Sequence, residues 1–410
     1  MMRILCALLL CLIGPAAWAD ADMAMPGAFG GYAMSREASG TSWQPEATPM
    51  PGIMSMDQGW MTMLHGFANQ VYDHQGGPRG ATEDFSNSML MLMADRAWGP
   101  DTLGLRAMLS LDPLMGKDGY PLLLQTGETG DGVHPLVDRQ HPHDLFMELS
   151  ASWSHAFDAT HSWYVYGGLP GEPALGPPAF MHRASGMDDP EAPISHHWLD
   201  STHVASGVVT LGYVLGQLKI EASAFHGREP DQFRWRIEGG SLDSGSARLT
   251  WNPAPDWSLQ LSQGYIHSPE QLQPTVNQHR TTASAMYDHP LDVGNWATTL
   301  AWGRDDNRPG HSLDAYLLES EWQWHSAHTV FLRLERVQED ELFDQVPVLA
   351  GQVIGVSKLS LGYIHDWQLG DHLYGGLGAL GSLYDLPTAA DSAYGGSPRS
   401  YMVFARIKLE

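Results

Sequence analysis

The chain has very little cysteine, and none beyond its first nineteen residues. Its two cysteines, Cys6 and Cys11, lie in a segment with an apolar run over residues 4–13 and an Ala-Trp-Ala motif that ends at Ala19. The run is too short to span a bilayer, and the whole pattern predicts a secretory signal peptide over residues 1–19. The mature chain would then carry no thiol, which excludes a disulfide-stapled scaffold and metal sites built from thiolates.

Long apolar runs and basic residues are also scarce. No later segment has the roughly 18–20 consecutive apolar residues that a membrane helix needs. The sequence has 22 Lys and Arg against 47 Asp and Glu, with a formal net charge of −25. Nucleic acid is therefore excluded as a partner, because binding to phosphates requires clustered basic side chains. Acidic loops that hold cations fit this balance, and the alternative is an acidic soluble surface.

Residues 20–57 and residues 58–410 differ in pattern. The first segment is rich in Met, Gly, Pro and Ala and shows no period, which predicts a flexible Met-rich periplasmic tail. From residue 58 onward, segments of 10–14 residues alternate apolar with small or polar side chains, as strands do between lipid and a wet lumen. We expect about sixteen such strands, centred on 58–72, 85–98, 101–112, 143–157, 160–168, 202–215, 218–229, 242–253, 256–268, 279–290, 293–306, 313–325, 328–340, 354–368, 371–385 and 398–409.

The connections between these segments alternate short and long along the chain. Outer-membrane barrels combine short periplasmic turns with long extracellular loops, so the rhythm favours an all-β fold. We predict a closed up-and-down transmembrane β-barrel of about 16 antiparallel strands, with both termini in the periplasm. Tryptophans near the segment ends fit the aromatic girdles of such barrels. The alternative is a soluble β-sandwich or propeller. One departure from the usual barrel pattern is the last residue, because many such barrels end in an aromatic residue and this chain ends in Glu410.

Methionine supplies the first set of candidate metal ligands. Thioether sulfur is a soft ligand that selects Cu(I). The tail offers Met23, Met25, Met54 and Met56. The phase of the strands predicts a single patch on the inner wall, formed by Met61, Met63, His65, Met89, Met91, Met93, Met108 and Met402. For the tail, the alternative is that its methionines reflect only the composition of a linker and bind nothing. For the barrel, the alternatives are that the methionines form an apolar plug or face the lipid.

Histidine and aspartate in the long loops supply the second set. Imidazole and carboxylate suit Cu(II), Zn(II) or Ni(II). The candidates are His141, His143, Asp144, His182, His196, His197, Asp200 and His203. The alternative is a hydrogen-bonded loop scaffold without metal. No Gly-x-Ser-x-Gly motif is present, and we expect no enzyme and no catalytic residues.

Three runs resemble a known family. They are residues 139–148 (RQHPHDLFME), 193–203 (PISHHWLDSTH) and 227–231 (GREPD). They resemble largely uncharacterised bacterial outer-membrane β-barrel proteins that are often encoded beside copper and heavy-metal resistance genes. The resemblance implies a metal-related role and offers no established site residues. A looser likeness is to the copper-resistance outer-membrane protein B family, although this tail lacks repeated Met-Asp-His boxes.

The sequence thus predicts a barrel in the outer membrane of a Gram-negative cell that binds or passes copper, for tolerance, efflux or sequestration. Tail methionines would capture Cu(I), the inner patch would offer exchangeable sites, and the His/Asp loops would serve the oxidised ion as an exit or a sensor. Copper is the only cofactor suggested; the expected partners are outer-membrane lipid, metal ions and periplasmic copper-handling proteins. The alternative is a general porin or small-solute channel with no metal role, which Arg248, Arg333 and Arg406 would suit.

Overall fold

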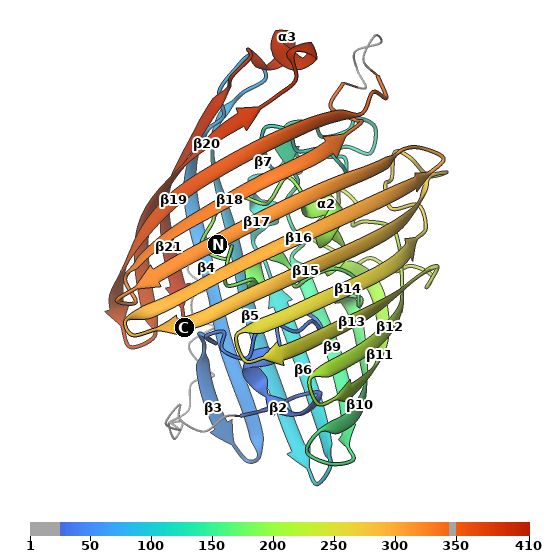
Figure 1. The fold of residues 1–410 in the computed structure, drawn as a ribbon, viewed down its shortest axis with the longest axis vertical. Coiled ribbons are helices and arrows are strands. Elements are labelled where there is room, and N and C mark those ends of the chain that lie inside the picture. The colour runs from blue at the N-terminus through green and yellow to red at the C-terminus, as the bar shows by residue number, and fades with distance from the viewer. Residues whose placement is uncertain (1–24, 344–349) are drawn as a thin grey trace.

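The computed structural model describes residues 25–343 and 350–410. Met23 and the predicted signal peptide lie outside these ranges. The described residues form a closed antiparallel barrel in which each strand pairs with its neighbour along the chain and β21 closes the ring onto β4 (Figure 1). Its sixteen strands are β4 (Trp60–His74), β5 (Thr82–Trp98), β6 (Asp101–Leu109), β9 (Phe146–Ala156), β10 (His161–Gly171), β11 (Ala205–Leu215), β12 (Leu218–Phe225), β13 (Ser244–Ala254), β14 (Trp257–Ile266), β15 (Asn277–Leu291), β16 (Gly294–Arg308), β17 (Ser312–Trp324), β18 (His328–Glu339), β19 (Ile354–Gly370), β20 (Leu373–Asp385) and β21 (Arg399–Leu409).

The predicted barrel and its sixteen strands are confirmed. Side chains alternate along the strands with charge inside and apolar groups outside: on β12, Lys219 and Glu221 are buried, whereas Ile220 between them is 59 % exposed. That pattern fits a barrel whose outer face meets hydrocarbon. Within the described residues, no helix is long and apolar enough to cross a membrane.

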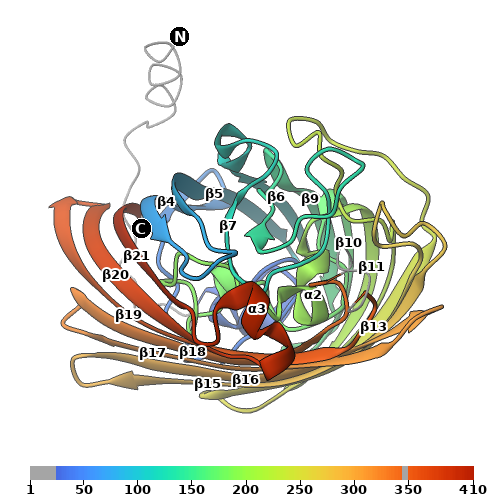
Figure 2. The same cartoon turned by 90° about the horizontal axis from the view of Figure 1, so that it is seen from above.

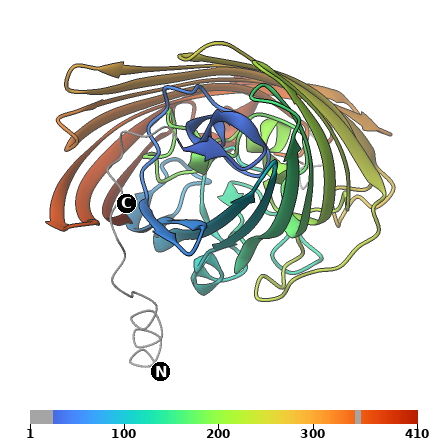
Figure 3. The ribbon, with the colours of Figure 1, turned by 90° about the horizontal axis from the view of Figure 1, so that it is seen from below.

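Residues 25–57 do not form a flexible tail, so that prediction is wrong for the part that the structure describes. They enter the barrel near the short turns, where β1 (Pro26–Gly27), β2 (Gly30–Ala33) and η1 (Met34–Arg36) lie inside the wall (Figure 3). The Arg106 guanidinium donates to Glu37 at 2.9 Å, and that of Arg248 donates to the Thr41 hydroxyl at 3.0 Å. Trp43 is almost fully buried. The composition suggested disorder because it has few aliphatic residues, but a polar wall offers partners for charged and aromatic groups.

A hairpin links this inner segment to the wall. The strand β3 (Ile53–Asp57) pairs with the first half of β4, below the point where β21 pairs with its second half. The turn consists of Gln58 and Gly59, with φ of 47° and 83°. Positive φ at both central residues is the geometry of a type I′ hairpin, which glycine tolerates best.

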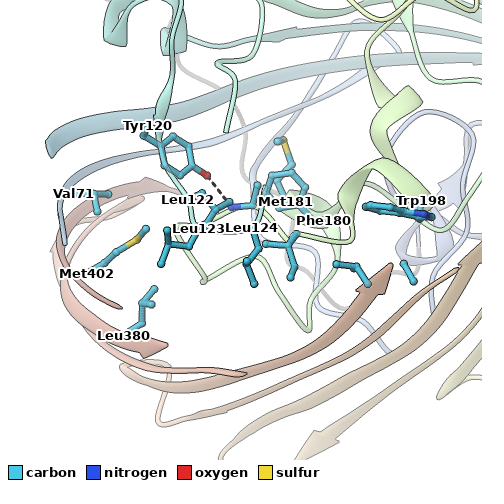
Figure 4. Close-up of a cluster of buried hydrophobic side chains, with 14 of the residues drawn as sticks. Val71, Tyr120, Leu122, Leu123, Leu124, Phe180, Met181, Trp198, Leu380 and Met402 are labelled. Carbon is cyan, nitrogen blue, oxygen red and sulfur yellow. Dashed lines mark hydrogen bonds between the residues drawn. The ribbon is translucent and has the colours of Figure 1, made fainter. Parts of the chain in front are cut away.

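Two long loops, residues 110–145 and 172–204, fold back into the lumen (Figure 2). They carry the short elements η2 (Asp112–Met115), β7 (Tyr120–Pro121), β8 (Arg139–Gln140), η3 (Phe180–His182), α2 (His196–Leu199) and η4 (Ser201–His203), while η5 (Thr388–Ala390) and α3 (Asp391–Tyr394) cap the last loop. Figure 4 shows their apolar side chains packed against the wall, including Leu122, Phe180 and Trp198. This packing is the core of the protein, and it fixes the loops that carry the candidate ligands.

Candidate metal centre

The inner wall carries methionines on the face that the sequence predicts. Met61, Met63, Met89, Met91, Met93 and Met108 are all buried and all point into the lumen, on β4, β5 and β6. The strand register groups the ligands into rows across the sheet. One row joins Met54, Met63 and Met93, and the next joins His65, Met91 and Met108. Directly opposite residues of a sheet have neighbouring side chains, so the sulfur atoms of each row lie close together.

A small cavity of about 70 Å³ lies against these rows. Its candidate metal ligands come from four parts of the chain: the inner segment, β4, β5 and the loop 172–204. They are the thioethers of Met50, Met63, Met91, Met93 and Met187 and the imidazoles of His65 and His182. We call this set the thioether site. Met50 and Met187 were not among the predicted ligands. Their positions beside the wall depend on how the inner segment and the loop 172–204 fold, which the sequence pattern does not indicate.

The thioether site contains little uncompensated charge. Among the described residues, Glu37 is the one carboxylate that lines it, and this side chain already accepts hydrogen bonds from Arg106 and from the Tyr32 hydroxyl. His182 places its Nε2 atom 3.3 Å from the Met108 sulfur. Burial lowers the pKa of His182 to about 3, so this imidazole is neutral at physiological pH. The site therefore offers mainly neutral, polarisable donors.

Not every predicted methionine belongs to the site. Met402 is fully buried, but the register places it opposite Asp73, ten residues along β4 from Met63 and about 30 Å away along the strand. Figure 4 shows Met402 with Val71 and Leu380. The single patch is therefore wrong for Met402, because β21 pairs only with the second half of β4. Met56 is 45 % exposed on β3, and Met25 packs against the apolar core away from the cavity lining.

A second cavity, of about 500 Å³, opens beside the thioether site toward the short turns. Met50, Pro51 and Met187 line both cavities. The larger one, which we call the lower vestibule, also carries the acidic side chains Asp188, Glu321, Asp371 and Glu410. Asp188 pairs with Arg406, and Glu410 pairs with Lys408. An acidic mouth of low dielectric raises the local concentration of cations.

Five histidines of the loops gather deeper in the lumen, and we call them the histidine cluster. They are His141, His143, His196, His197 and His203. Neighbouring ring centres are 5.1 to 6.4 Å apart, from His196–His203 to His141–His143 and His141–His196. Histidines of two separate loops thus lie near one another, while their role as metal ligands stays a prediction. His182 does not join them; it lies at the thioether site, beside His65.

Acidic groups and carbonyls hold the cluster from outside. The Nδ1 atoms of His143 and His196 lie 2.9 and 2.8 Å from Asp112 and Asp200, and that of His203 is 2.8 Å from the Asp200 carbonyl. His197 Nδ1 is 3.3 Å from Glu229, and His141 Nε2 is 3.3 Å from Glu128.

The charge state of the cluster follows from burial and from these carboxylates. Burial lowers the pKa of His141, His196 and His203 and favours the neutral ring. For His197, burial also lowers the pKa, but Glu229 and Glu128 outweigh it, so that its pKa is raised overall.

The two predicted aspartate ligands serve other roles. Asp144 pairs with Arg234 at 3.3 Å, and Asp200 accepts from Arg183 at 2.6 Å as well as facing His196. Both carboxylates are engaged by guanidinium groups, so neither is free to bind an ion directly. Among residues 25–343 and 350–410, no three His, Asp or Glu groups already form a closed ligand set around one point.

No protein-family model matches the chain, and no curated protein matches it. Several solved structures do match the chain in fold. OmpF of Salmonella typhi, in complex with daunomycin, is 9 % identical with a TM-score of 0.52, over 87 % of this chain and 100 % of that one. A loop-deletion mutant of OmpT, an outer membrane protein of Vibrio cholerae, is 9 % identical with a TM-score of 0.48 over 86 % and 100 %. An anion-selective porin from Comamonas acidovorans is 13 % identical with a TM-score of 0.46 over 85 % and 100 %. At such identities the likeness to OmpF shows one thing: the chain has the fold of an outer-membrane porin.

Proposed function

We propose that this barrel lies in the outer membrane and binds Cu(I) at the thioether site, exchanging the ion with the compartment that its short turns face. The observation that carries the proposal is a ligand set: five thioethers and two imidazoles line one cavity of about 70 Å³. The resemblance to proteins encoded beside copper-resistance genes points in the same direction.

The donor chemistry selects the ion. Thioethers are neutral and soft, so they favour Cu(I) over Mg²⁺, Ca²⁺ or Zn²⁺, which prefer harder donors or thiolates. Glu37, a carboxylate in the lining, is held by Arg106 and Tyr32. A monovalent ion thus meets polarisable sulfur without strong charge attraction, which suits a site that must also release its ion.

The lower vestibule gives the ion a route to the site. Its acidic lining draws cations in, and Met50 and Met187 separate it from the thioether site. Both methionines have flexible side chains, since Met has three rotatable bonds and readily changes its packing. We infer that they pass the ion from the vestibule to Met63, Met91 and Met93.

The burial of lumenal charge argues against a general porin. The charged side chains that would line an aqueous channel are instead buried, as Arg248 and Arg333 show with 2 % and 1 % exposure. Arg248 pairs with Glu221 on the wall and donates to Thr41 of the inner segment, and Arg333 pairs with Asp189 of a loop. These contacts fill the lumen with protein, whereas free diffusion of solutes needs water there.

The proposal is tested by titrating detergent-solubilised protein with Ag⁺, an air-stable soft ion, and then with Cu(I) under anaerobic competition with a chromogenic chelator. The test variant is Met91→Leu/Met93→Leu. Leucine keeps most of the volume and costs less than about 1.5 kcal/mol of stability, but it removes the sulfur. We expect affinity to fall about tenfold or more, equivalent to ~1.4 kcal/mol.

Met89→Leu is the matched control, because Met89 is equally buried on the same strand but does not line the cavity. Its affinity should equal that of the unmodified protein. Equal binding by the control and the double variant would mean that the methionines only pack the wall. Rapid swelling of proteoliposomes in small sugars, without Ag⁺ binding, would favour the porin instead.

A further inference from the structure

We propose that the histidine cluster is a second metal site, which binds a divalent ion with imidazole ligands and prefers Cu²⁺. This inference goes beyond the thioether site and does not depend on it. The two sites differ in ligand type, in position along the lumen and in the charge that surrounds them.

The five rings come from two loops that meet in the interior. His141 and His143 follow β8 on the first loop, whereas His196, His197 and His203 lie on α2 and η4 of the second. Between the two loops, the ring centres of His143 and His203 are 5.3 Å apart, and those of His141 and His197 are 5.9 Å apart. At this point the two loops thus meet through imidazoles, beside the apolar side chains that join them elsewhere.

Four of the five rings are held at one nitrogen and open at the other, whereas His141 faces the Pro142 carbonyl through Nδ1 and Glu128 through Nε2. His143, His196 and His203 engage a carboxylate or a carbonyl through Nδ1. Their Nε2 atoms, and that of His197, are buried without a hydrogen-bond partner in the described part of the chain. An acceptor on one imidazole nitrogen, with the other nitrogen left free, is how proteins orient histidine for a metal ion.

The spacing of the rings suits a shared ion. An Nε2–metal bond of about 2 Å puts each ring centre roughly 3 Å from the metal, so two ligand rings lie about 5 to 6.5 Å apart. The observed separations of 5.1 Å for His196–His203 and 5.3 Å for His143–His203 fall in this range. The nitrogens are not yet gathered around one point within residues 25–343 and 350–410. Binding therefore requires the rings to turn about their side-chain bonds, with His203 common to both pairs.

The surrounding charge favours a divalent over a monovalent ion. Carboxylates face four of the five rings: Glu128, Asp112, Asp200 and Glu229. Arg234 and Arg183 balance two of them, Glu128 and Asp200. Asp112 and Glu229 remain as net negative charge next to nitrogen donors. Among divalent ions, a nitrogen site binds Cu²⁺ most tightly according to the Irving–Williams order.

A cation can approach the cluster from the side of the long loops. Glu128, which faces His141, also lines a cavity of about 510 Å³ together with Glu270 and Glu341. This acidic cavity lies among the connections that follow β6, β14 and β18. It gives the histidine cluster an entrance of its own, separate from the lower vestibule.

The test uses untagged full-length protein in detergent, stripped with a chelator and titrated with Cu²⁺. Electron paramagnetic resonance reports nitrogen ligands through hyperfine splitting. We expect one tightly bound Cu²⁺ with at least three nitrogen ligands. His203→Gln should lose about 100-fold or more in affinity, because His203 is shared by both ring pairs. His289→Gln is the control, since His289 is a half-exposed strand residue paired with Asp256.

Asp112→Asn tests the orientation of His143. An amide can donate to Nδ1 and so move the ring proton to Nε2, which removes that lone pair from the metal. We expect affinity to fall about 10- to 100-fold and the spectrum to lose one nitrogen while the fold persists.

Cu²⁺ bound as tightly by His203→Gln as by the control, or an oxygen-only spectrum, would overturn the inference and leave the cluster as a loop scaffold. Ag⁺ binding at the thioether site should be unchanged in both cluster variants, so the two proposals fail separately.

Discussion

Arg183 is the anchor that holds the loop 172–204 against the wall. Its side chain is fully buried, and its Nε and Nη2 atoms donate to Glu319 on β17 at 2.8 and 3.1 Å. Its Nη1 atom donates to Asp200 at 2.6 Å and to the Pro178 carbonyl at 2.8 Å. One guanidinium thus joins the wall, the start of the loop and the carboxylate behind His196.

We predict that Arg183→Met opens this loop. The substitution removes the guanidinium that two buried carboxylates share, while Glu319 keeps Arg333 and Asp200 keeps His196. Breaking a buried ion pair costs up to about 3–5 kcal/mol. If the cost falls on the loop, its opening equilibrium rises roughly 100- to 5000-fold, at 1.4 kcal/mol per factor of ten. The barrel itself keeps its ladder hydrogen bonds and should remain folded.

Hydrogen–deuterium exchange measures this change directly. The amides of Gly186 and Met187 donate to the Arg183 carbonyl and report the local opening. Arg236→Met is the matched control, because Arg236 is 60 % exposed and water screens its pair with Asp231. The loop supplies ligands to both sites, so Ag⁺ and Cu²⁺ affinities should fall together. Unchanged exchange at Gly186 and Met187 would refute this account of how the ligands are held.

Three further outcomes follow. A Cβ at Gly52 would lie 2.8 Å from Met63 Cγ and 3.0 Å from its sulfur, so Gly52→Ala should displace that ligand and weaken Ag⁺ binding. Gly239→Ala is the control, because a Cβ there has no atom within 4 Å. Equal Ag⁺ binding by the two variants would contradict the position of Met63. Deleting the gene should raise sensitivity to copper in a growth assay without changing susceptibility to large antibiotics, and the reverse result would favour a porin. Burial raises the pKa of Asp188, but Arg406 and Lys408 outweigh burial and lower the pKa to about 2 from 3.8. The Asp188 carboxylate therefore stabilises the fold above about pH 4, and this stabilisation is lost as the pH falls toward 2. Hydrogen–deuterium exchange in the loop 172–204 should rise over that interval in the unmodified protein and should not do so in Asp188→Asn.

The sequence predicts the barrel well because each strand lies between two different solvents. Every second side chain must be apolar, and the turns must alternate in length, so both signals repeat along the whole chain. The same logic predicts the inward face of the methionines. Asn87 and Asp95 share the face of Met89, Met91 and Met93, and polar side chains mark the wet side of a strand.

The inner segment and the composition of the sites could not be predicted from the sequence. The contacts of Glu37 with Arg106 and of Thr41 with Arg248 join residues 69 and 207 positions apart. No local period encodes such pairs. Met402 was misplaced because closure offsets β21 along β4, and a register offset leaves no trace in the alternation.

The loops show the same limit. His182 was grouped with the other loop histidines, yet η3 carries it to Met108, on the other side of Phe180. Which side of a buried loop faces which part of the wall depends on packing over the whole lumen. The clustering of His141, His143 and the histidines of α2 and η4 was predictable because both runs are dense in histidine and both loops are long enough to meet.

The most direct test of the central claim is X-ray absorption spectroscopy at the copper edge on Cu(I)-loaded, untagged protein. Several sulfur scatterers around the ion, reduced in number in Met91→Leu/Met93→Leu and unchanged in Met89→Leu, would match the thioether site. A coordination shell of only oxygen and nitrogen, or a protein that retains no Cu(I), would contradict it.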